Sequence, residues 1–65
     1  MNNATLTPEE SKRMKELLFN IRDNLNAIEI EVNKPTSVFR YYIEEKLNKI
    51  NIDMSCINYI IKGDE

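Results

Sequence analysis

Histidine is absent from this 65-residue chain, and cysteine and glycine occur once each, as Cys56 and Gly63. A single thiol cannot form an intrachain disulfide, and without histidine it cannot build a structural zinc site. A glycine-rich phosphate loop is excluded as well, because Gly63 is the only glycine. Association with another chain therefore remains as the ordinary way for so small a domain to gain stability.

Residues suited to catalysis are also scarce. Acid–base catalysis depends on histidine or on a carboxylate in a desolvated cleft. The adjacent pairs Glu9-Glu10 and Glu44-Glu45 fall at an expected helix start and on an expected polar face. Cys56 has no cationic neighbour in the sequence that would favour a reactive thiolate. We therefore expect no enzymatic activity, no cofactor and no metal ion.

The formal charge of −2 argues against binding to duplex DNA, which rests on lysine and arginine neutralising phosphates. Three basic residues, Lys12, Arg13 and Lys15, are offset by neighbouring glutamates. The chain has neither the start of a signal peptide nor the ~20 consecutive apolar residues of a membrane span. We expect a cytoplasmic protein without nucleic-acid or membrane partners, and the asparagine, isoleucine and lysine usage indicates a phage or low-GC bacterial source.

A first helix is predicted over residues 8–33, after a disordered lead of residues 1–6. Thr7-Pro8-Glu9-Glu10 combines an N-cap, a proline at the first helical position and the glutamate of a capping box. Apolar residues then follow at alternating steps of four and three, the spacing of a coiled-coil seam. They are Met14, Leu18, Ile21, Leu25, Ile28 and Val32.

A second helix is predicted over residues 37–62. Pro35 ends the first helix, and Thr36 or Ser37 can cap the second. Lys62 and Gly63 are typical of a helix end. The apolar seam repeats the same steps, with Ile43, Leu47, Ile50, Met54, Ile57 and Ile61.

The two seams are in phase for a hairpin with its turn centred at residue 34, pairing Leu18 with Ile50 and Leu25 with Ile43. We therefore predict a single all-α domain over residues 1–65, an antiparallel helical hairpin that dimerises into a four-helix bundle. The alternating stretches 28–32 and 50–54 also allow strands, which would give an α-β-α-β order.

Apolar residues outside the seam indicate a binding surface. Two helices cover one stripe each, and a further exposed apolar stripe usually marks an interaction site. On the second helix this set contains Val38, Tyr42, Ile52, Cys56 and Tyr59. We expect them to contact a protein partner, either a second copy in a homodimer or another protein. The chain would then be a small regulator of the inhibitor, antagonist or adaptor type.

Residues 17–50 resemble the helical-hairpin aspartyl-phosphate phosphatases of sporulating bacteria, whose second helix carries an S-x-x-L-D motif. The corresponding stretch here is Glu44-Glu45-Lys46-Leu47-Asn48, in which Glu44 replaces the serine and Asn48 the key aspartate. The resemblance implies a second hypothesis, a phosphatase of response regulators in which Asn48 positions water. A third hypothesis is an acidic anti-repressor that occupies a DNA-binding surface.

Overall fold

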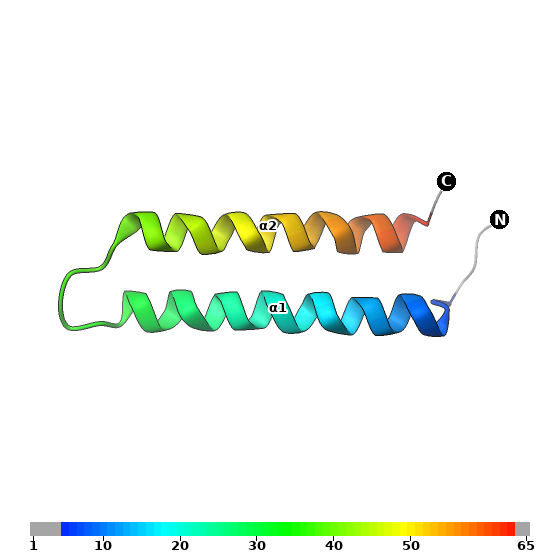
Figure 1. The fold of residues 1–65 in the computed structure, drawn as a ribbon, viewed down its shortest axis with the longest axis horizontal. Coiled ribbons are helices and arrows are strands. Elements are labelled where there is room, and N and C mark those ends of the chain that lie inside the picture. The colour runs from blue at the N-terminus through cyan, green and yellow to red at the C-terminus, as the bar shows by residue number, and fades with distance from the viewer. Residues whose placement is uncertain (1–4, 64–65) are drawn as a thin grey trace.

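A computed structural model describes residues 5–63 as two helices, α1 (Pro8–Val32) and α2 (Arg40–Lys62), joined by residues 33–39. The helices run antiparallel and side by side, with the start of α1 beside the end of α2 (Figure 1). The predicted all-α hairpin is confirmed. Both alternating stretches are helical, and residues 5–63 contain no strand. Of the predicted disordered lead, residues 1–4 lie outside the described residues.

The start of α1 agrees with the predicted capping box. The Glu10 backbone N–H donates to Thr7 Oγ1 at 3.1 Å, and the Thr7 backbone N–H donates to Glu10 Oε1 at 3.0 Å. Pro8 occupies the first turn, where its missing N–H has no intrahelical partner to lose. Two of the free donors at this helix end are thereby satisfied within the chain.

The second helix begins three residues later than predicted, because the chain is held in the connection by Glu31 near the end of α1. The backbone N–H of Phe39 donates to Glu31 Oε2 at 2.9 Å, and Lys34 Nζ forms an ion pair with the same carboxylate at 3.1 Å. Phe39 is the extended residue before α2 and supplies no side-chain cap. The predicted start at residue 37 is therefore wrong, and the connection is centred at residue 36 rather than 34.

The end of α2 follows the prediction from Lys62 and Gly63. Gly63 has a φ of 76°, a conformation that glycine adopts without strain. Its backbone N–H donates to the carbonyl oxygens of Tyr59 and Ile60, at 3.1 and 3.2 Å. These bonds satisfy two of the last carbonyls of the helix. Neither described helix has an apolar stretch long enough to cross a membrane.

Only half of the predicted seam residues are shielded between α1 and α2. One half of each apolar stripe, the central row, is shielded between the helices and consists of Met14, Ile21, Ile28, Ile43, Ile50 and Ile57. The other half, the apolar side row, is exposed and consists of Leu18, Leu25, Val32, Leu47, Met54 and Ile61. The prediction that the apolar side rows are buried between α1 and α2 is therefore wrong.

The seam passes instead between the central rows and the residues three positions further along each helix. We call these the mixed rows: Leu17, Asn24, Glu31, Lys46, Asp53 and Ile60, all of them buried or half-buried. Each helix is rotated about its own axis so that polar side chains enter the interface while Leu18, Leu25 and Leu47 leave it. The resulting core is small, because only Leu17 and Ile50, 4% and 9% exposed, are buried apolar residues among those described.

Candidate protein-interaction site

The mixed rows of both helices open onto the same broad side of the hairpin. A shallow hollow on that side is lined by Asn24 from α1 and by Lys46 and Asp53 from α2. The apolar side rows lie on the opposite flank of each central row, since they are four rather than three residues further along. Both apolar side rows therefore lie together on the other broad side.

We call this second side the broad apolar face. It consists of the two exposed apolar side rows, with the half-buried central rows between them. The described chain measures 52 × 18 × 13 Å, so the hairpin is a single layer of helices. A single layer cannot cover such a face, and domains ordinarily bury one apolar layer against another.

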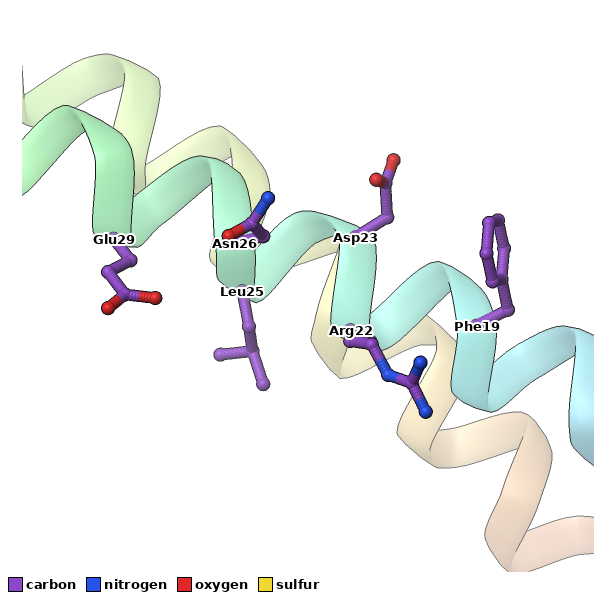
Figure 2. Close-up of a pocket in the computed structure, with 6 residues that line it drawn as sticks. All are labelled: Phe19, Arg22, Asp23, Leu25, Asn26 and Glu29. Carbon is purple, nitrogen blue, oxygen red and sulfur yellow. The ribbon is translucent and has the colours of Figure 1, made fainter.

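Leu25 illustrates how the apolar side rows are presented. Figure 2 shows its side chain projecting from α1 between the side chains of Arg22 and Glu29. These three side chains, with those of Phe19, Asp23 and Asn26, line a shallow surface hollow formed by α1 alone. An exposed leucine bordered by charges of both signs is the arrangement expected at the edge of a protein interface.

Four of the five predicted partner-binding residues lie outside the broad apolar face, whereas Val38 lines a hollow with Ile43 and Leu47 of that face. Ile52 and Tyr59 are exposed, and both line hollows on the side of the mixed rows. Cys56 is half-buried and shares a hollow with Tyr59. Tyr42 is partly exposed with Lys46 Nζ 5.1 Å from its ring centre, and Val38 is exposed in the connection. The structure brings only Ile52, Cys56 and Tyr59 to one side, and their role in binding stays a prediction.

Two groupings could not be read from the sequence. Arg13 and the pair Glu9 and Glu10 lie across the helices from Cys56, in the hollow that also contains Tyr59. The sequence separates Arg13 from Cys56 by most of the chain, so the cation near this thiol appears only in the folded hairpin. The second feature that the sequence did not reveal is the exposure of the apolar side rows. Apolar residues at steps of four and three predict a seam that another helix covers.

The ionisable groups offer no centre for metal chemistry in the part of the chain that is described. No group of three or more cysteine, aspartate and glutamate side chains among residues 5–63 is placed to hold a metal ion. Hydrogen bonds from the Phe39 backbone and from Lys34 hold the pKa of Glu31 below its ordinary value. Both partners belong to the connection, so this carboxylate serves to order the turn. Asn48, the residue singled out by the phosphatase resemblance, is exposed on α2.

Comparison with models of protein families, with curated proteins and with solved structures finds no match to this chain.

Proposed function

We propose that this chain is a non-enzymatic protein-binding module, a regulator of the inhibitor, antagonist or adaptor type, and that the broad apolar face is its binding site. The same face is the site of self-association: two copies cover it mutually and form a four-helix bundle. Such bundles bury apolar residues of facing helices in a common core.

The observation that supports this proposal is the rotation of both helices. An isolated hairpin would gain more from burying Leu25 and Met54 than from half-burying Asn24 and Asp53, because polar groups cost free energy to desolvate. Instead, the polar residues are half-buried and the apolar ones exposed. The arrangement becomes favourable once the broad apolar face is covered by another helical layer.

Two isoleucines of α2 provide a matched test of this face. Ile61 belongs to the apolar side row and Ile52 does not, yet each is 63% exposed in the hairpin. We expect Ile61→Asp to weaken self-association by at least ~2 kcal/mol, roughly 30-fold in the dissociation constant, because a carboxylate would enter a dry interface. Ile52→Asp should leave the dissociation constant within a few-fold of the original.

Sedimentation equilibrium gives both dissociation constants, and circular dichroism at a concentration high enough to keep each variant dimeric verifies that its helix content is unchanged. A second substitution on the face, Met54→Asp, guards against an effect specific to the end of α2. If Ile52→Asp weakens association while Ile61→Asp and Met54→Asp do not, the binding site is the surface predicted from Ile52 and Tyr59, and the broad apolar face is not the interface.

A further inference from the structure

The charges beside the broad apolar face determine how a second copy would sit on it. Two hairpins can stack face to face with their connections at the same end, so that α1 of each lies beside α2 of the other. Alternatively the connections lie at opposite ends, and α1 lies beside α1 and α2 beside α2. Neighbouring helices are antiparallel in both arrangements, so helix polarity does not distinguish them.

A row of exposed residues borders each apolar side row on its outer flank, three positions before or four positions after its members. We call these the rim residues: Lys15, Arg22 and Glu29 on α1, and Glu44, Asn51 and Asn58 on α2. The rim is basic toward the open end of the hairpin, where α1 begins, and acidic toward the connection. Figure 2 shows two of these residues, Arg22 and Glu29, projecting on either side of Leu25.

With the connections at the same end, the rim of α1 lies beside the rim of α2 from the other copy. Residues at the same distance from the connections then face each other. Glu29 would then face Glu44 of the other copy, and this like-charge contact would occur twice in the dimer. With the connections at opposite ends, Glu29 faces Lys15 of the other copy, again twice, while Glu44 faces Asn58. Arg22 then faces Arg22 of the other copy at the twofold axis, a single like-charge contact against two attractive pairs. Like charges across an interface disfavour an arrangement, and opposite charges favour it.

Within its own hairpin, no favourable electrostatic interaction explains the negative charge of Glu29. It lies in the last turn of α1, where the helix dipole disfavours negative charge, and this turn contains no basic residue. Glu31, its acidic neighbour, is bound by Phe39 and Lys34, whereas the exposed Glu29 carboxylate takes part in no ion pair among the described residues. A cation supplied by a second copy would account for Glu29.

We propose that the second copy packs on the broad apolar face with its connection at the opposite end, so that Lys15 of each chain pairs with Glu29 of the other. This inference rests on the proposed function. The two copies then overlap along their whole length, with Arg22 near the twofold axis. Both mixed-row sides face outward, leaving Tyr59 and Cys56 exposed or half-buried on two opposite surfaces of the bundle.

Charge reversal tests the arrangement, because the two orientations predict effects of opposite sign. Glu29→Lys should weaken the dimer roughly tenfold at low ionic strength, since two attractive pairs become repulsive. The double variant Lys15→Glu/Glu29→Lys should restore the original dissociation constant. Glu16→Lys is the matched control, because Glu16 is an exposed glutamate of α1 outside the rim, and we expect it to change the constant little. A tighter dimer with Glu29→Lys would overturn the proposal.

Distance measurement tests the orientation independently of charge. A spin label at Thr36→Cys, in a Cys56→Ser background that retains the dimer mass, reports the separation of the two connections by pulsed electron resonance. Opposite ends predict about 40 Å, the length of a helix of this size, and the same end predicts at most about 20 Å, two helix diameters. The short distance would overturn the orientation but leave the broad apolar face as the interface. A monomeric mass would overturn the second copy itself.

Discussion

At the scale of single residues, Glu31 joins the end of α1 to the start of α2. Its carboxylate accepts hydrogen bonds from the Phe39 backbone and from Lys34 Nζ, and Lys34 in turn lies 5.1 Å from the centre of the Phe39 ring. The residue is only 7% exposed, although it sits beside a surface turn. No sequence pattern predicts this role. The Glu31 carboxylate can accept the backbone N–H of Phe39 only after the chain has turned back on itself.

The lowered pKa of Glu31 gives a pH dependence with a definite sign. A carboxylate with a lowered folded-state pKa stabilises the fold above its ordinary pKa of 4.5, and that stabilisation is lost as the pH falls through the lowered value. We expect Glu31→Gln to reduce the free energy of unfolding at neutral pH and to make it less sensitive to acid below pH 4.5. Urea unfolding at fixed protein concentration, followed by circular dichroism over a pH series, measures both effects.

Glu16→Gln is the control, since Glu16 is exposed on α1 and its carboxylate takes part in no hydrogen bond or ion pair among residues 5–63. Other carboxylates titrate in all three proteins, so the difference between each variant and the original isolates one glutamate. Equal acid sensitivity of Glu31→Gln and the original protein would show that this carboxylate does not link the two helices.

At the scale of the helices, the ends of α1 and α2 differ in how far local sequence determines them. Thr7, Pro8 and Glu10 act on their own helix within four residues, so the start of α1 was predictable. Gly63 acts locally in the same way at the end of α2. The start of α2 was not predictable, because Phe39 is held by a residue eight positions earlier.

The membership of the apolar stripes was predictable from local spacing, but the direction in which each stripe faces was not. Steps of four and three define which side chains lie on one side of a helix. They do not determine how far the helix is rotated about its axis, which depends on what it packs against. Leu17 and Leu18 illustrate this: the first is buried by α2 and the second, one residue later, is exposed.

The capping box at the start of α1 contributes to the free energy of unfolding. Thr7→Ala removes the acceptor for the Glu10 N–H, and we expect it to lower the free energy of unfolding by about 1 kcal/mol. Thr7→Ser keeps a hydroxyl acceptor and should retain most of this contribution. Thr5→Ala, two residues before the N-cap, is the matched control and should have no effect on urea unfolding. A loss of stability in Thr5→Ala equal to that in Thr7→Ala would argue against the cap.

At the scale of the whole molecule, the hairpin is one layer with two unlike sides. The side of the mixed rows combines polar residues such as Asn24, Lys46 and Asp53 with apolar ones such as Ile52 and Tyr59, and the other side is the broad apolar face. A chain this small rarely supplies enough core to be stable alone. We therefore propose that the hairpin is half of an assembly, in which the apolar side rows form the common core.

The most direct test is the molar mass in solution across a dilution series, measured by sedimentation equilibrium together with circular dichroism. We predict a dimer, with twice the 7.7 kDa mass of one chain. On dilution this species should dissociate and lose helix content, because the exposed hairpin keeps too little buried surface. A mass of 7.7 kDa at every concentration, with full helix content and a cooperative unfolding transition, would contradict it.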